Sequence, residues 1–228
     1  MNEGESRLLL QNTKGWRDSS LIVIINLRQL FNCKHADLGA CQMISLKDIL
    51  GKQTDLNPLT YRDRLQLAVY TAASVLQLYD TPWMPNAPTS AHVFFPVWEG
   101  CPQYSYAFIV ASGRSEPNAV KPPPVIRNPT LLALGVLLIE IIRGQTIDTL
   151  RSPDEKITYG LSTFLSDYIT ARRLLTEIYQ ASSNYGSAVR RCIDGEFPRE
   201  ILDLDNADFR QEVYAGVVAL LEEDLSHT

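Results

Sequence analysis

The sequence predicts a mainly helical fold of the α+β class, in which a few short strands accompany a larger set of helices. Two observations support this prediction. Apolar residues recur at helical spacing after Thr60, above all in the segments 60–80 and 131–142. Strand-like sequence is confined to short runs, of which 21–25 is the clearest. The chain has 228 residues, 45% of them hydrophobic, so it can bury a sizeable core.

The first sixty residues contain the least regular sequence. The run 21–25 is apolar at every position, which is typical of a strand that is covered on both faces. The run 8–10 is a candidate for a shorter partner strand. A short helix is predicted over 45–50, because a serine opens this segment and Gly51 follows it.

Thr60 is predicted to open a long helix. Its side chain can accept hydrogen bonds from the free amides of the first turn, and Asp63 stands where a capping box places an acid. Apolar residues then cover more than one face of the helix, as in the centre of a folded domain. Pro82 is expected to end it, because proline cannot continue a helix.

Residues 81–129 hold most of the prolines and most of the irregular sequence. Two short strands are predicted there, over 92–95 and 104–110. The segment 113–124 is predicted to be an exposed, extended loop, because the consecutive prolines at its end favour the polyproline II conformation.

Four helices are predicted in the rest of the chain. Asn128 and Pro129 form a typical helix start, and the segment 131–142 is apolar nearly all round, so it predicts a buried helix that ends at Gly144. The three remaining helices are expected over 161–180, over 185–193 with Gly195 after it, and from about Asp205 onward.

Composition and charge exclude several classes of protein. The net charge of −5 gives no electrostatic reason to expect nucleic acid as a partner. The acidic N-terminus does not resemble a secretory or mitochondrial signal. The longest apolar stretch, 131–142, is shorter than the about 20 residues of a membrane span. Four cysteines are too few for a disulfide scaffold. We therefore expect a cytoplasmic protein, with the nucleus as an alternative.

Several runs resemble parts of the large, C-terminal lobe of protein kinases. The run 131–144 resembles the kinase F-helix, 64–79 the E-helix, 45–50 the D-helix, and 188–193 a late helix that ends in a basic residue, Cys and Leu. Together they make the chain similar to a kinase-like domain of filamentous fungi, over roughly residues 60–224. Related architectures belong to programmed cell death or incompatibility systems.

The resemblance implies a kinase-like large lobe with a small strand remnant of the N-terminal lobe. It divides the chain into 1–58, a strand-containing remnant with a hinge-like segment, and 59–228, the helical lobe. We expect the two parts to form one continuous structural unit.

The same resemblance implies a degenerate catalytic site. Phosphoryl transfer in kinases needs a glycine-rich loop, a strand lysine, a catalytic Asp, and an Asn and an Asp that bind Mg²⁺. No such loop or lysine strand precedes the segment that resembles the D-helix. Ala87 stands at the position of the catalytic Asp, His92 at that of the metal-binding Asn, Ala107 at that of the metal-binding Asp, and Thr130 at that of the buried F-helix Asp. We therefore expect no phosphotransfer activity and no cofactor.

Two other groups of side chains are candidates for chemistry. Cys33, His35 and Cys41 offer three soft metal ligands, but a structural zinc site usually has four, so partly buried thiols are the simpler interpretation and no metal is predicted. Glu140 falls in the middle of the apolar helix. A buried carboxylate needs a partner, and an arginine or a backbone amide is the expected one.

Three further groups are candidates for binding. Paired arginines form an anion-binding patch if their helices adjoin, although solvated helix faces explain them equally well: Arg172, Arg173, Arg190 and Arg191. Three consecutive prolines can dock in an aromatic groove or simply stiffen a loop: Pro122, Pro123 and Pro124. Three large side chains bracket the degenerate region and either line a pocket or anchor the loop: Trp83, His92 and Trp98.

The favoured functional hypothesis is a non-catalytic, kinase-like binding or regulatory module with a protein partner, in fungal signalling or cell-death and incompatibility pathways. The alternative is an enzyme of a non-kinase class, or an accessory protein of a metabolic gene cluster, with its site in the 81–110 loop.

Overall fold

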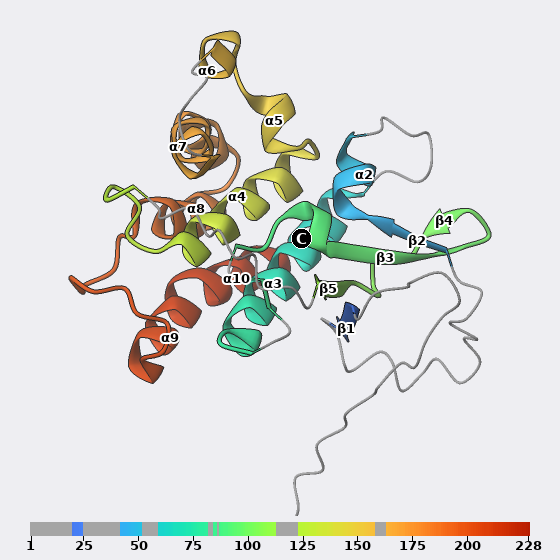
Figure 1. Ribbon diagram of the computed structural model, residues 1–228, viewed down its shortest axis with the longest axis horizontal. Helices are drawn as coiled ribbons and strands as arrows, with labels where there is room; N and C mark the ends of the chain where they lie inside the picture. The colour runs from blue at the N-terminus through green and yellow to red at the C-terminus, as the bar shows by residue number, and fades with distance from the viewer. Residues whose placement is uncertain are drawn as a thin grey trace, which may run out of the picture.

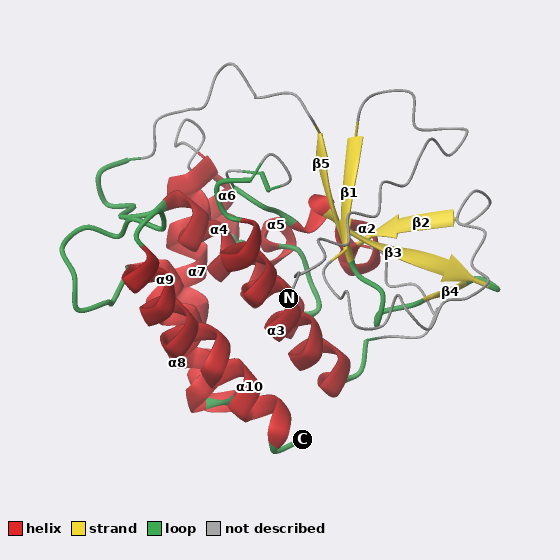
Figure 2. Cartoon of the chain, turned by 90° about the horizontal axis from the view of Figure 1, so that it is seen from below, coloured by secondary structure: helices red, strands yellow, loops and turns green. Residues whose placement is uncertain are grey.

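The computed structural model describes residues 20–24, 42–51, 59–81, 84–85, 87–112, 123–157 and 163–228. A bundle of helices lies beside a small antiparallel sheet (Figures 1 and 2). This arrangement confirms the predicted mainly helical α+β class. The predicted order of a strand, a short helix, a long helix, two small strands, an apolar helix and a helical tail is also observed, with further elements inserted between them.

The sheet has five strands and joins sequence from both sides of residue 58. Its path is β1, β5, β3, β2, and β4 pairs with β3 beside that path. All pairings are antiparallel, with Val23 opposite Ile109 and Ile44 opposite Phe95. The strands are β1 Ser20–Ile24, β2 Gln42–Ser45, β3 Val93–Trp98, β4 Cys101–Pro102 and β5 Phe108–Ser112.

The strands after residue 90 differ from the predicted ones in their bounds. β3 continues through Pro96, and β5 begins at Phe108 rather than at 104. The Pro96 carbonyl accepts a hydrogen bond from the Gln103 amide at 2.9 Å. In an antiparallel ladder the N–H and C=O groups of one residue point to the same side, so the Pro96 nitrogen, which has no hydrogen, faces the side of β4 and β5. Pro96 lies between the residues of β3 that pair with β5 and those that pair with β4, so no ladder hydrogen bond is lost there. The strand therefore tolerates a proline.

Helix α2 (Leu46–Gly51) follows β2 directly, and α3 (Tyr61–Leu78) is the predicted long helix. Its capping box is confirmed: Thr60 Oγ1 accepts from the Asp63 amide at 3.2 Å, and Asp63 Oδ2 accepts from the Thr60 amide at 3.0 Å. The helix ends four residues before Pro82, because the Thr81 amide and hydroxyl both donate to the Leu78 carbonyl.

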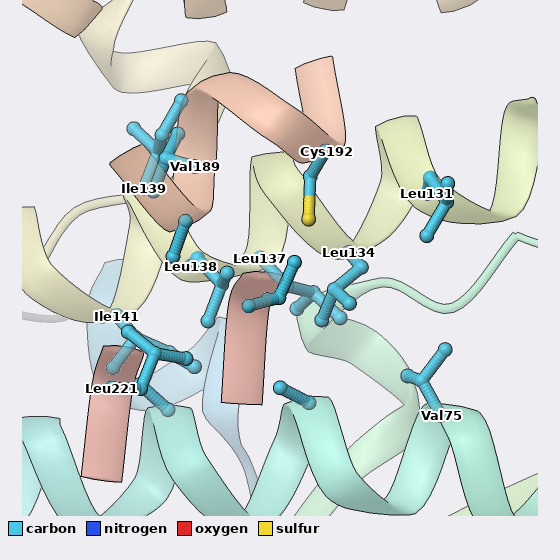
Figure 3. Packing of buried hydrophobic residues seen from close by; sticks show 14 of the residues in the cluster. Val75, Leu131, Leu134, Leu137, Leu138, Ile139, Ile141, Val189, Cys192 and Leu221 are labelled. Carbon is cyan, nitrogen blue, oxygen red and sulfur yellow. The ribbon is translucent and has the colours of Figure 1, made fainter. Parts of the chain in front are cut away.

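Helix α4 (Pro129–Arg143) is the central helix of the bundle. Asn128 Oδ1 accepts from the Leu131 amide at 2.9 Å, and Gly144 ends the helix with a φ of 68°, as predicted. Side chains of α4 form the hydrophobic core with Val75 of α3, Val189 and Cys192 of α8, and Leu221 of α10 (Figure 3). The core is one cluster that extends from Leu46 to Leu221.

The remaining helices complete the bundle. The segment after Gly144, where the sequence predicts no helix, forms two short helices, α5 (Ile147–Leu150) and α6 (Pro153–Ile157). They are followed by α7 Thr163–Ala181, α8 Ser183–Asp194, α9 Ala207–Val213, the π-helical turn η3 Tyr214–Val218, and α10 Ala219–Ser226. The described part of the chain contains no helix that is long and apolar enough to cross a membrane.

Several predicted features fall outside the described residues. These are the strand at 8–10, the residues Cys33, His35, Cys41, Trp83 and Pro122, and most of the loop at 113–124.

Candidate functional site

A tight turn precedes β3 in the region that the sequence assigns to the degenerate catalytic loop. This 3₁₀ turn, η2, covers Ser90–His92, and the half-buried Ala87 lies just before it. The Thr89 amide donates to His92 Nδ1 at 3.1 Å, and Thr89 Oγ1 lies 2.9 Å from the same atom. Because Nδ1 accepts from the amide, this nitrogen carries no proton and holds the turn together.

The buried carboxylate of Glu140 reaches the same turn from α4. Its Oε1 accepts from the Ile147 amide at 2.8 Å, and the carboxylate also hydrogen-bonds with the buried Ser90 hydroxyl. Burial raises the pKa of Glu140, and the two hydrogen bonds partly oppose this. The expectation of a backbone amide as the structural partner is confirmed. Glu140 thus joins α4 to η2 and to the start of α5.

The other two positions that the resemblance implies to be degenerate are both buried. Ala107 is buried directly before β5, and Thr130 is buried in the first turn of α4. Across the described ranges, no three His, Cys, Asp or Glu side chains come together in a way that could hold a metal ion.

The four arginines of the expected anion-binding patch have separate partners within the chain. Arg172 pairs with Asp194 at 3.2 Å, and Arg190 pairs with Glu196 at 2.5 Å. Arg191 donates to the Gly216 carbonyl at 3.0 Å. Helices α7 and α8 do adjoin, and each guanidinium group has a partner within the chain, so the anion-binding patch stays a prediction.

Arg173 contacts both a carboxylate and a backbone carbonyl. Its Nε lies 2.7 Å from Glu155 Oε1, and its Nη2 donates to the Leu150 carbonyl at 2.7 Å. The hydrogen bond from Arg173 is the main reason that the pKa of Glu155 is lowered to about 2. The pair fastens α6 to α7 and has a structural role.

Of the three residues expected to line a pocket, the two that the structure describes, His92 and Trp98, do not lie close together. His92 directly precedes β3 and Trp98 is its last residue, so the length of the strand, about 20 Å, separates them. The Trp98 ring packs against Tyr106, with ring centroids 5.3 Å apart. Trp98 therefore anchors the β3–β4 end of the sheet. Trp83 lies outside the described residues.

Two of the three prolines in the proposed docking loop are described. Pro123 is half-buried and Pro124 is exposed. The Ile126 amide donates to the Pro123 carbonyl at 2.9 Å, so the chain turns here just before α4.

An ordered segment lies between α8 and α9, where the sequence predicts no element. Arg127 Nη1 donates to the Gly195 carbonyl at 2.5 Å, and its Nη2 donates to the carbonyls of Arg199 and Glu200 at 2.6 and 2.9 Å. The neighbouring Asn128 donates from Nδ2 to the Leu202 carbonyl at 2.9 Å. The one signal in the sequence is the alternation of apolar and acidic residues over 202–205.

Comparisons with known proteins give one result. No curated protein and no solved structure matches the chain. The model of one family, described as "Domain of unknown function (DUF7580)", matches residues 4–228. The chain, with its helical bundle and small antiparallel sheet, therefore belongs to the DUF7580 family.

Proposed function

We propose that the protein is a non-catalytic binding and regulatory module with a kinase-like fold. The order of its elements supports the fold part of this proposal, because β1, α2, α3, β3, β5 and α4 follow one another as the resemblance to a kinase large lobe implies. The buried α4, which carries the run that resembles the F-helix, occupies the centre of the bundle, as the core helix of such a lobe does.

One observation supports the proposal that the module is non-catalytic and acts by binding. Where the resemblance implies a base and two metal ligands, the chain has Ala87, His92 and Ala107, and His92 Nδ1 is engaged by Thr89. The carboxylate that reaches this region, Glu140, is engaged by Ile147 and Ser90. Phosphoryl transfer depends on positioned carboxylates and Mg²⁺. These side chains favour a module that acts by binding a protein, in the signalling or cell-death pathways that the resemblance implies.

The experiment is a thermal unfolding series with ATP, with and without Mg²⁺. A ligand at about one hundred times its Kd stabilises a folded protein by about 2.7 kcal/mol, which shifts Tm by several degrees. We expect no shift with millimolar ATP in either condition, and no transfer of labelled γ-phosphate to a generic protein substrate. A Tm increase that requires both ATP and Mg²⁺ would contradict the proposal.

A further inference from the structure

The segment between α8 and α9 is held by hydrogen bonds from side chains outside it. Arg127 and Asn128 hold the carbonyls of Gly195, Arg199, Glu200 and Leu202, as described above. Farther along, Arg210 Nη1 donates to the carbonyls of Leu204 and Asp205 at 2.6 and 3.2 Å. The Asn206 amide donates to the Asp203 carbonyl at 3.1 Å. Because these carbonyls are engaged, another molecule can recognise this segment mainly through its side chains.

Exposed and buried residues alternate along the segment. Leu202 and Leu204 are 7% and 0% exposed and belong to the core. Ile201, Asp203 and Asp205 are exposed between and beside them. At 78%, Ile201 is the most exposed of the large hydrophobic side chains in the described part of the chain. An ordered backbone therefore presents an apolar side chain to solvent beside two carboxylates.

The carboxylates of this face also act on Tyr79, which directly follows α3. Burial raises the pKa of Tyr79, and the negative charges of Asp205, Asp203 and Asp80 raise it further. All three are exposed, and none has an ion pair with a cation of the described residues. Arg210, the one cation that lowers the pKa of Tyr79, donates to backbone carbonyls instead. The exposed face of the segment is therefore negatively charged at Asp203 and Asp205 and apolar at Ile201.

We propose that Ile201, Asp203 and Asp205 form a docking surface for a segment of a protein partner that carries an apolar side chain next to lysine or arginine residues. The inference rests on the proposed binding function and names the class of partner. The apolar side chain would cover Ile201, and the basic side chains would meet the carboxylates. Because the segment is already ordered, little conformational entropy is lost when the partner binds.

The test uses the full chain and an array of short synthetic peptides. The peptides are acidic, neutral or basic, each with and without a Leu or Phe. We expect binding to the basic peptides that contain an apolar residue, and weaker binding as salt increases. Fluorescence anisotropy with one such peptide then measures the effect of Ile201→Ser and of the double variant Asp203→Asn/Asp205→Asn. Each should weaken binding about tenfold. Asparagine at 203 keeps the oxygen that accepts from the Asp205 amide at 2.9 Å, so the turn is preserved.

Two matched controls separate this surface from general effects. Ile169 is an exposed apolar residue of α7, and Glu223 is an exposed acid of α10. Ile169→Ser and Glu223→Gln should leave peptide affinity unchanged. No binding to any peptide, equal binding of acidic peptides, or equal loss in the controls would overturn the docking surface. A Tm increase with ATP and Mg²⁺ would instead overturn the proposed function, so the two failures are distinguishable.

Discussion

At the scale of single residues, Glu140 shows how the fold holds a buried charge. The residue is only 4% exposed, and its carboxylate forms hydrogen bonds with the Ile147 amide and the Ser90 hydroxyl. Asp167 and Asp148 add negative charge nearby and raise its pKa further. Arg151 pairs with both of these aspartates. The raised pKa means that the folded protein holds the Glu140 proton more tightly than the unfolded chain does.

The variant Glu140→Gln tests this environment through the pH dependence of stability. An acid with a raised pKa in the folded state contributes stability below its unfolded pKa of about 4.5, and this contribution is lost as the pH rises through the folded value. Glutamine keeps an oxygen for the Ile147 amide but does not titrate. The wild-type free energy of unfolding should therefore fall relative to the variant as the pH increases above 4.5, by about 1.4 kcal/mol per unit of pKa shift.

Urea unfolding of both proteins from acid to neutral pH measures the difference. Glu223→Gln, at an exposed acid on α10, is the matched control and should give a curve parallel to the wild type. Parallel curves for Glu140→Gln and the wild type would contradict the raised pKa.

The hydrogen bonds of single residues could be predicted from the sequence where the two bonded residues are close neighbours along the chain. The capping box at Thr60, the cap at Asn128 and the left-handed Gly144 depend on neighbours within four positions, and all three are confirmed. The contacts of Arg127 with Gly195 and of Asn128 with Leu202 join residues 68 and 74 positions apart. No local pattern reports such pairs, so the ordered segment after α8 could not be predicted.

At the scale of secondary-structure elements, the contact of α4 with α8 depends on a glycine. A Cβ atom placed on Gly135 would lie 2.5 Å from Cδ1 of Ile193 and 3.0 Å from Cβ of Cys192. Gly135→Ala should therefore destabilise the protein by about 2 kcal/mol, although alanine favours a helix over glycine by about 1 kcal/mol. Ile193→Val removes the Cδ1 atom, so Gly135→Ala should be at least about 1 kcal/mol less harmful in that background.

Chemical denaturation of the single and double variants gives this coupling energy. Ile178→Val shortens another buried isoleucine, on α7, that is not among the atoms nearest to Gly135. Its effect should simply add to that of Gly135→Ala. Additive effects for the Ile193 pair would show that the two helices do not meet at this glycine.

The type and order of the long helices could also be predicted from the sequence. The early end of α3 and the π-helical turn before α10 could not. The helix before Pro82 stops early because Thr81 binds the Leu78 carbonyl. The last helix contains a π turn whose Gly216 carbonyl accepts from Arg191 of α8. Periodicity shows neither feature, because each depends on a side chain that competes for backbone groups.

At the scale of the whole molecule, the sheet connects the predicted N-terminal part to the helical part. β2 precedes residue 58 and β3 follows it, and the two pair from Gln42 with Val97 to Ser45 with Phe94. Leu46 and Leu50 of α2 belong to the same core as α4 and α10. These contacts lead us to expect that the chain unfolds as one cooperative unit, although the sequence resemblance divides it at residue 58.

Tryptophan fluorescence and circular dichroism can test this cooperativity together. The chain has three tryptophans, and replacing Trp16 and Trp83 with phenylalanine leaves Trp98 at the end of β3 as the single reporter of the sheet. Far-UV circular dichroism reports the helices. The two signals should show the same midpoint and the same slope in urea, because separate units would lose their structure at different concentrations. A fluorescence change that precedes the loss of helix would mean that the sheet unfolds on its own, and that the helical part keeps its stability without it.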